Sequence, residues 1–329
     1  MKLETDDLIA DLNRWHKAYI RHIKALSYSN NTLELYNRAI LQFIEYMHEY
    51  QEDIMIVGIR AHHFTGFLGW MEEQAEKQGK SALNGNILSK STKETYLKAV
   101  KAFFTFISDN NDELVTFERF FKNIRIANDT KPEGKIDYLT TQEVSSLISV
   151  LERQKSKSGD YGSYRDSLLI RLMLFAGLRI SEALGVKLSD ISRSSDDTFA
   201  IKVFAKGGIF QEAHIDSRKI EDELEYFKKV AALAPDEYIM QTRSGKRMTR
   251  QGAYQVASTL YRHAGVRHDG LHILRHTFAM WMTSRGVDLV DIKDALRHSS
   301  ITTTTVYAKA TKESVIKAVL DPAKEEKWA

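Results

Sequence analysis

Apolar residues recur at helical spacing through the first third of the chain. They fall at every third or fourth position in four stretches, 8–26, 32–47, 61–77 and 92–107. Residues typical of helix caps stand at Ser29-Asn30-Asn31, before the second stretch, and Ser91-Thr92-Lys93-Glu94 forms a capping-box pattern at the fourth. The pattern predicts four helices, with a short final helix at 113–124.

The pattern changes after a polar, aperiodic stretch. Residues 128–137 contain Pro132 and Gly134 and predict a linker between two domains, 1–127 and 138–329. Beyond it, a capping box at 140–143 opens one helix, and a strongly apolar helix at 164–176 ends at Gly177.

A hairpin and a further helix follow in the second domain. Residues 198–205 and 209–215 are rich in β-formers and flank Lys206-Gly207-Gly208, which predicts two antiparallel strands with Lys206 at the tip. A basic-led helix is expected at 245–261, where four side chains could reach a groove or phosphates: Arg247, Arg250, Gln251 and Tyr254.

The second and fourth helices echo each other at an offset of 60 positions. Ser29, Thr32 and Phe43 correspond to Ser89, Thr92 and Phe103. Two interpretations remain open, similar caps with similar packing, or two helix starts that both face a phosphate backbone. The second interpretation assigns nucleic-acid contacts to Lys90, Lys93 and Lys98, with Lys101 beside them.

Composition narrows the class of protein. A chain of 329 residues with 43% hydrophobic and 28% charged residues is globular and long enough for two domains. A net charge of +3 is only weak support for a polyanionic partner. The absence of cysteine excludes disulfides and thiolate chemistry, and no apolar run is long enough to span a bilayer. A cytoplasmic protein is expected.

The candidate chemistry gathers in the stretch 270–309, which holds His272, Arg275, His298 and Tyr307. His272 and His276 have the i, i+4 spacing of a zinc pair, but Arg275 between them and the missing glutamate base argue against a metal. The set instead suits metal-free phosphoryl transfer.

Each residue type has a part in that chemistry. Two guanidinium groups can clamp the oxygens of a phosphodiester and stabilise the extra charge of its transition state. A phenol can attack the phosphorus, although its ordinary pKa of about 10 calls for a base or nearby positive charge. Histidines can move that proton, and a lysine can protonate the leaving alkoxide.

These residues stand in motifs that resemble those of the tyrosine recombinases of the lambda-integrase type, and within them the single-recombinase Xer kind. The resemblance covers roughly 138–310. Its motifs are AGLRISEAL at 176–184 with Arg179, AKGG with Lys206, HILRHTFA at 272–279, and LRHSSI at 296–301 followed by Tyr307.

The resemblance implies a mainly α, two-domain DNA clamp. An N-terminal, SAM-like helical core-binding domain would precede a C-terminal α-helical catalytic domain with a small antiparallel β-sheet. Tyr307 would form a 3′-phosphotyrosine, Arg179 and Arg275 would bind the phosphate, and Lys206 would act as general acid. The remaining roles fall to His272 in proton transfer, His298 on the phosphate and Glu182 as the residue that orients Arg179.

The resemblance also implies an assembly and a biological role. Four protomers on two double-stranded DNA sites would exchange strands through a Holliday junction without a cofactor or metal. The expected role is resolution of chromosome dimers at a dif-like site, on nucleoid DNA, with a DNA translocase of the cell-division machinery as a regulatory partner. A mobile-element integrase, a type IB topoisomerase and a non-catalytic DNA-binding protein remain as alternatives.

The chain departs from the family pattern at one position close to the site. Arg297 precedes the last histidine, where the family usually has glycine, and it adds a charge near the site or near a neighbouring subunit. We also expect flexibility in the threonine run before Tyr307.

Overall fold

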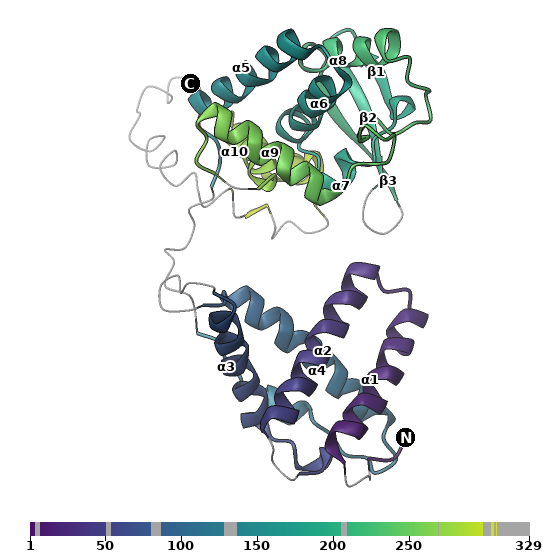
Figure 1. Ribbon diagram of the computed structural model, residues 1–329, viewed down its shortest axis with the longest axis vertical. Coiled ribbons are helices and arrows are strands. Elements are labelled where there is room, and N and C mark those ends of the chain that lie inside the picture. Colours follow the sequence, from purple (N-terminus) through teal and green to yellow (C-terminus); the bar gives the residue numbers. More distant parts are fainter. Residues whose placement is uncertain are drawn as a thin grey trace, which may run out of the picture. The chain divides into compact units, whose positions relative to one another are not determined.

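The structure is a computed structural model of the chain. It describes residues 1–3, 7–50, 54–79, 87–127, 137–204, 209–268, 270–298, 304, 305 and 307. The chain divides into two compact units, Met1–Pro132 (unit 1) and Glu133–Ala329 (unit 2), shown in Figure 1. Most of the predicted linker lies outside the described residues.

The described part of unit 1 contains four helices and two short 3-10 turns. These are α1 (Leu8–Ala25), α2 (Asn30–Tyr50), η1 (Ile56–Gly58), α3 (Ala61–Lys77), α4 (Lys90–Asn110) and η2 (Glu118–Phe121). Aromatic side chains fill the centre, where the ring of Phe43 contacts those of Phe64, Phe67 and Phe104. The four predicted helices are therefore present, and their apolar stripes meet in one aromatic core.

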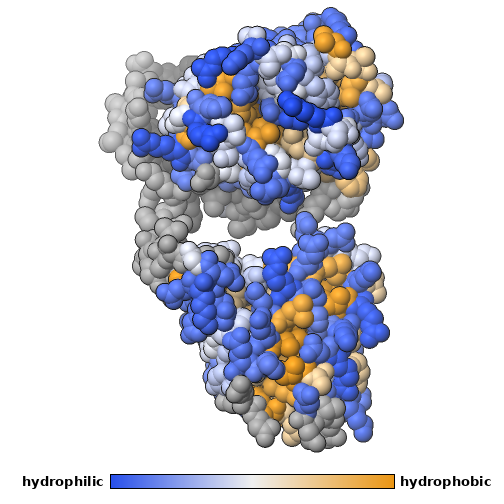
Figure 2. Space-filling view, in the orientation of Figure 1, coloured by the Kyte–Doolittle hydropathy of each residue, from blue (hydrophilic) through white to orange (hydrophobic). Residues whose placement is uncertain are grey.

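The helices of unit 1 leave part of their apolar surface uncovered. Leu26 is 57% exposed and Leu41 is 42% exposed. In Figure 2 the visible face of unit 1 carries a band of hydrophobic side chains between hydrophilic ones.

The echo between α2 and α4 reflects one shared cap geometry. The Ser29 hydroxyl accepts from the Thr32 N–H at 3.2 Å, and the Ser89 hydroxyl accepts from the Thr92 N–H at the same distance. Ser89 thus caps α4, and the capping box predicted at 91–94 was placed two residues too late. The side chains of Phe43 and Phe103 are both fully buried, so similar caps and similar packing account for the repeat.

The helix expected at 113–124 is reduced to the 3-10 turn η2. Leu114 has a φ of 54°, which breaks a right-handed helix. The side chain of Asn111 bonds both the N–H and the carbonyl of Val115, which stabilises a turn in place of the first helical turn.

Unit 2 packs helices around a three-stranded antiparallel sheet. Its elements are α5 (Thr141–Ser158), α6 (Tyr161–Phe175), α7 (Ile180–Ala183), η3 (Leu188–Asp190), β1 (Ile191–Ser195), β2 (Thr198–Phe204), β3 (Phe210–Asp216), η4 (Ser217–Lys219), α8 (Glu221–Glu225), η5 (Tyr226–Val230), α9 (Arg250–Ala264), α10 (His272–Ser284) and α11 (Leu289–Ala295). The strand order is β1-β2-β3.

The predicted hairpin is confirmed, and its strands pair from Thr198↔Asp216 to Phe204↔Phe210. β1 was not predicted, because its exposed polar residues resemble a loop. The helix expected at 245–261 begins later, at Arg250, since Thr249 caps it and Arg247 pairs in a bridge with Gln241. None of the helices that the structure describes is long and apolar enough to cross a membrane.

Helix α6 is the central element of unit 2, and the chain after it forms the site. Its residues from Leu168 to Leu174 are almost all fully buried. It ends at Phe175, and Gly177 just beyond its cap has a φ of 59°, which favours glycine. A side chain there would also approach the Phe278 ring to 2.6 Å. This corner turns the chain directly into Arg179.

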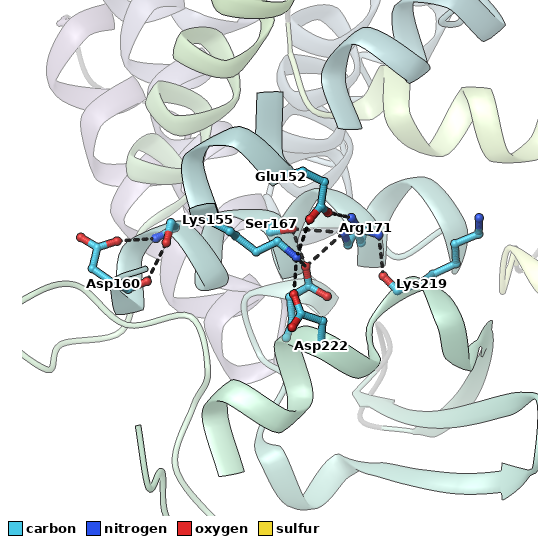
Figure 3. A network of polar contacts seen from close by, with 9 residues as sticks. Glu152, Lys155, Asp160, Ser167, Arg171, Lys219 and Asp222 are labelled. Carbon is cyan, nitrogen blue, oxygen red and sulfur yellow. Dashed lines mark hydrogen bonds and ion pairs between the residues drawn. The ribbon is translucent and has the colours of Figure 1, made fainter. Parts of the chain in front are cut away.

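A buried ionic network fixes α5, α6 and α8 to one another (Figure 3). The ammonium group of Lys155 lies 2.8 Å from Glu223 and 2.6 Å from Asp222. On the opposite side, Arg171 ion-pairs with Glu152 and with Glu223, at 3.2 Å from the latter. The Ser167 hydroxyl donates to Glu223 at 2.6 Å, so Oε1 of this buried carboxylate contacts Lys155, Arg171 and Ser167.

We predict that Lys155→Met lowers the free energy of unfolding by about 3 kcal/mol, because it leaves the Glu223 carboxylate buried with less positive charge around it. Urea denaturation followed by circular dichroism measures the change. The control is Lys229→Met, which removes an exposed ion pair with Glu225 and should cost less than about 1 kcal/mol. Equal effects of the two substitutions would contradict a stabilising role for the network.

Candidate active site

Arg179 stands at the corner between α6 and α7 and is held by Glu182. Its backbone N–H donates to Glu182 Oε2 at 2.8 Å, and its Nη1 donates to Oε1 at 2.7 Å. Its Nη2 donates to the carbonyl of Arg297 at 3.0 Å. The Arg179 side chain remains 32% exposed, so the guanidinium is oriented but accessible to a ligand. Glu182 therefore contacts both the backbone and the guanidinium of Arg179.

Arg275 approaches the same corner from α10. Its guanidinium donates to the carbonyls of Gly177 and Leu296, and its side chain is only 5% exposed. Burial and the nearby charges of Arg179 and Arg297 lower the pKa of Arg275 to about 9. The group is therefore still a cation at neutral pH, in a place where positive charge is already concentrated.

The end of α11 explains why Arg297 and His298 face this corner. The N–H of Arg297 bonds the Asp294 carbonyl at 2.9 Å, and the N–H of His298 bonds the Lys293 carbonyl at 3.0 Å. This pair of bonds is a Schellman motif, whose central residue adopts a left-handed conformation. Arg297 is that residue, with a φ of 54°.

Arg297 lies inside the site rather than on a neighbour-facing surface. Its side chain is 2% exposed, and its Nη2 lies 3.0 Å from Glu182 Oε2. Burial alone would raise the pKa of Glu182, but the charge of Arg297 and the hydrogen bonds from Arg179 hold it below its ordinary value. The Glu182 carboxylate thus accepts hydrogen bonds from the guanidinium groups of both Arg179 and Arg297.

Tyr307 is buried with its hydroxyl against His276. The phenol oxygen lies 2.8 Å from Nδ1 of His276, and the residue is 2% exposed. Burial raises the pKa of Tyr307, although Arg275 opposes the shift. Burial also lowers the pKa of His276, with His272 and Arg275 adding to it. A neutral imidazole is therefore in hydrogen-bond contact with the candidate nucleophile.

The sequence prediction did not include His276 among the catalytic residues. It was considered only as half of a zinc pair with His272, whose ring lies 6.4 Å away on the same face of α10. Its partner Tyr307 is 31 positions further along the chain. The i, i+4 spacing with His272 was the available signal, because it places both imidazoles on one helix face.

His298 and Thr304 are in contact in the same segment. Nδ1 of His298 lies 2.9 Å from the Thr304 hydroxyl, and Thr304 is fully buried. The pKa of His298 is lowered to about 4 by burial and by Arg275 and Arg179. Flexibility was expected in the threonine run, but Thr304 is anchored, and 301–303 lie outside the described residues.

The other predicted site residues of unit 2 have different environments. Lys206 lies outside the described residues, although the strands that flank it are described. Arg247 donates to the Leu184 carbonyl at 3.0 Å and stacks over the Tyr238 ring, just behind α7. The three remaining candidates are exposed at the start of α9: Arg250, Gln251 and Tyr254.

The predicted contacts of unit 1 fall on α4. Lys90 and Lys98 line a cavity of about 450 Å³ together with Lys101 and Arg125, and Lys90 pairs there with Glu94 at 3.6 Å. Lys93 is in a different position, since its ammonium group lies 2.8 Å from Glu72 and its charge is already balanced. Among the residues that the structure describes, no group of three His, Asp or Glu side chains is arranged to hold a metal ion.

Comparison with known proteins identifies the family. The model of the phage integrase family matches residues 137–314, more than half of the chain, so the protein belongs to that family. Tyrosine recombinase XerH of Campylobacter jejuni is 28% identical over 225 residues, which cover 67% of this chain and 62% of the relative. Tyrosine recombinase XerC of Staphylococcus aureus is 22% identical over 315 residues, 94% of this chain and 96% of the relative.

The fold of the chain is also similar to that of a solved Xer recombinase. The crystal structure of XerH bound to a palindromic difH substrate in a post-cleavage complex superposes with a TM-score of 0.80. The alignment has 21% identity and covers 97% of this chain and 98% of that one. The predicted resemblance to Xer-type tyrosine recombinases and the predicted fold class, mainly α with a small antiparallel sheet, are confirmed.

We predict that His298 lowers the free energy of unfolding of unit 2 in mild acid. The pKa of His298 is about 4 in the folded chain and about 6.5 when unfolded. The contribution of neutral His298 to the free energy of unfolding is therefore fully present above pH 6.5. It is lost as the pH falls toward 4, because the unfolded chain binds the proton more readily than the folded chain. Between pH 7 and pH 5 the melting temperature of the wild type should fall more steeply than that of His298→Asn. Parallel profiles of the two proteins in scanning calorimetry would contradict this assignment.

Proposed function

We propose that the protein is a site-specific DNA recombinase that cuts and rejoins DNA through a phosphotyrosine at Tyr307. The observation that carries the proposal is the convergence of Arg179 and Arg275 on one corner of unit 2. The buried phenol of Tyr307 belongs to the same site through Arg275 and His276. Membership of the phage integrase family supports the same chemistry.

The strand-cleavage step follows from the residues of the site. The Tyr307 oxygen attacks the scissile phosphorus and forms a 3′-phosphotyrosine, while the bond to the 5′ oxygen breaks. His276 is the hydrogen-bond partner that accepts the phenolic proton, in the tautomer protonated on Nε2. Lys206 gives a proton to the leaving 5′ oxygen. Two guanidinium groups stabilise the charge that develops on the non-bridging oxygens.

Two histidines complete this assignment. His298, neutral at pH 7 and beside the arginines, hydrogen-bonds the phosphate. His272, on the same face of α10 as His276, assists proton transfer once DNA is bound.

The rejoining step needs no external energy source. The phosphodiester energy is kept in the tyrosyl link, and attack by the 5′ hydroxyl of a partner duplex reverses the first step. The reaction therefore requires neither ATP nor a metal. Four protomers on two DNA sites would exchange strands in this way through a Holliday junction.

The biological role that we propose is resolution of chromosome dimers at a dif-like site in the cytoplasm, under control of a DNA translocase. It is supported by the relatives XerH and XerC and by the difH complex of XerH. A mobile-element integrase would use the same chemistry at other sites. A non-catalytic DNA-binding protein is disfavoured, since it would not need a buried tyrosine paired with a histidine beside two arginines.

DNA contacts outside the catalytic corner are proposed for both units. On unit 1 they are the basic residues around the α4 cavity: Lys98, Lys101 and Arg125, together with Lys90, whose charge Glu94 partly balances. On unit 2 they are the exposed residues that open α9, Arg250, Gln251 and Tyr254, with Arg247 beside them. Lys93 contributes less than its position in the sequence suggested, because Glu72 balances its charge.

We predict that the wild-type protein forms a covalent adduct with a nicked suicide duplex that contains its site, detected by denaturing electrophoresis. Tyr307→Phe should form no adduct, and Arg275→Ala should bind the duplex but cleave on the order of 10²–10³ times more slowly. An adduct that survives Tyr307→Phe would refute the mechanism. Binding by the wild type without any adduct would favour the non-catalytic alternative, and relaxation of plasmids that lack a site would favour a topoisomerase.

We predict that the double variant Lys98→Ala/Lys101→Ala weakens the salt dependence of DNA binding. The slope of log K against log salt should become shallower by roughly 0.9 for each phosphate that the protein no longer neutralises. Lys93→Ala on the same helix is the matched control and should leave the slope nearly unchanged. Fluorescence anisotropy between 50 and 200 mM salt, roughly the range in which such interactions are screened, measures both. If Lys93→Ala changes the slope as much as the double variant, the assigned surface is wrong.

A further inference from the structure

Arg297 has a conformation that the helix end alone does not explain. It occupies the left-handed position of the Schellman motif that ends α11, with a φ of 54°. Glycine forms this motif without the steric conflict that a Cβ atom creates. A long, charged and buried side chain is therefore unfavourable here on two counts, its backbone conformation and its desolvation.

The contacts of the side chain offset these costs and point to Glu182. Nη2 of Arg297 lies 3.0 Å from Glu182 Oε2 and also donates to the Gly177 carbonyl at 3.0 Å. Nη1 donates to the Ala295 carbonyl at 2.7 Å. Among the described residues, Nε finds no acceptor. The guanidinium is thus fixed against the corner from which Arg179 projects.

The backbone of Arg297 acts on the same group. Its carbonyl accepts from Nη2 of Arg179 at 3.0 Å, while its side chain holds the carboxylate that binds the other side of Arg179. Arg297 therefore contacts Arg179 directly through its carbonyl and indirectly through Glu182.

The charges of the corner show what this arrangement achieves. Oε1 of Glu182 accepts from Nη1 of Arg179, and Oε2 accepts from the Arg179 N–H and from Arg297. Arg275 is further away, with its Nη1 at 3.9 Å from Oε2. Without the guanidinium of Arg297, Oε2 would keep the Arg179 N–H as its only close donor among the described residues, and Arg275, already within 3.9 Å, could turn toward that oxygen and away from a phosphate.

We propose that Arg297 is a positioning residue for the phosphate site: it holds the Glu182 carboxylate against Arg179 and leaves the charge of Arg275 for the scissile phosphate. The inference rests on the proposed recombinase function, since it concerns the same site. Arg297 itself does not touch the reacting atoms. It acts through Glu182 and Arg179, on the geometry and charge that meet the phosphate.

Three substitutions of Arg297 separate charge from backbone strain. Arg297→Met keeps a long side chain and the left-handed backbone but removes the charge. Arg297→Gly removes the charge and also relieves the backbone, so it should fold even if the methionine variant does not. Arg297→Lys restores a charge without the planar guanidinium. Ala232→Gly, at an exposed position with a φ of 47°, is the control for relief of strain alone.

The experiment measures the single-turnover cleavage rate on a nicked suicide duplex at saturating protein, and the Kd for the intact duplex. Arg297→Met and Arg297→Gly should cleave about 10² times more slowly than the wild type. Their Kd should change less than about threefold, since contacts along the whole duplex set the affinity. Arg297→Lys should recover to within about tenfold of the wild-type rate, and Ala232→Gly should cleave like the wild type.

The outcomes distinguish this inference from the proposed function. If the wild type forms no adduct at Tyr307, the recombinase proposal itself fails. If the wild type cleaves and Arg297→Gly cleaves equally fast, the positioning role is refuted. A loss of DNA binding as large as the loss of cleavage, or a lysine variant no better than the methionine variant, would refute it as well.

Discussion

The buried carboxylate of Glu182 holds the charged corner of unit 2 together. A buried, charged carboxylate is favourable there only because the guanidinium groups of Arg179 and Arg297 and a backbone N–H surround it. The negative charge of Glu182 in turn reduces the repulsion between these closely spaced guanidinium groups. The positive charge of the corner still exceeds the one negative charge of Glu182. Such an excess suits a ligand that carries one negative charge in the ground state and more in the transition state.

The fold positions the arginine side chains of this corner through hydrogen bonds to backbone carbonyls. Carbonyls of Gly177, Leu296 and Arg297 accept hydrogen bonds from arginine side chains, so the end of α6 and the end of α11 set the guanidinium positions. The ionic network of Figure 3 lies on the same helix α6, where it ties this element to α5 and α8. Stability and site geometry therefore depend on one buried helix.

Sequence patterns were sufficient for the elements with strong periodicity or sharp end signals. The four helices of unit 1, the buried helix before Gly177 and the hairpin around Lys206 followed from apolar spacing and turn residues. Arg179, Arg275 and Tyr307 could be proposed as site residues because they stand in recognisable motifs. The structure then brings all three to the neighbourhood of Glu182 or His276.

Features that depend on distant partners could not be predicted in the same way. The role of His276 arises from a hydrogen bond to a residue far along the chain, and the burial of Arg297 arises from the carbonyl of Gly177 and the carboxylate of Glu182. Strand β1 has polar, exposed residues and is defined only by its pairing with β2. Local sequence carries little information about such contacts, because tertiary packing creates them.

The described hydrogen-bond partners of Arg179, Glu182, Arg275, His276 and Arg297 all come from unit 2. The described contacts of the site therefore lie within unit 2, while the basic residues of α4 belong to the other compact unit. Under the proposed function, substitutions among the basic residues of α4 would change contacts to DNA without altering the hydrogen bonds that hold Arg179, Arg275 and Tyr307 in unit 2. For protein engineering, this makes the exposed residues of α4 and of the start of α9 the positions to diversify, and the contacts around Glu182 the part to preserve, in directing the proposed recombinase to a new target.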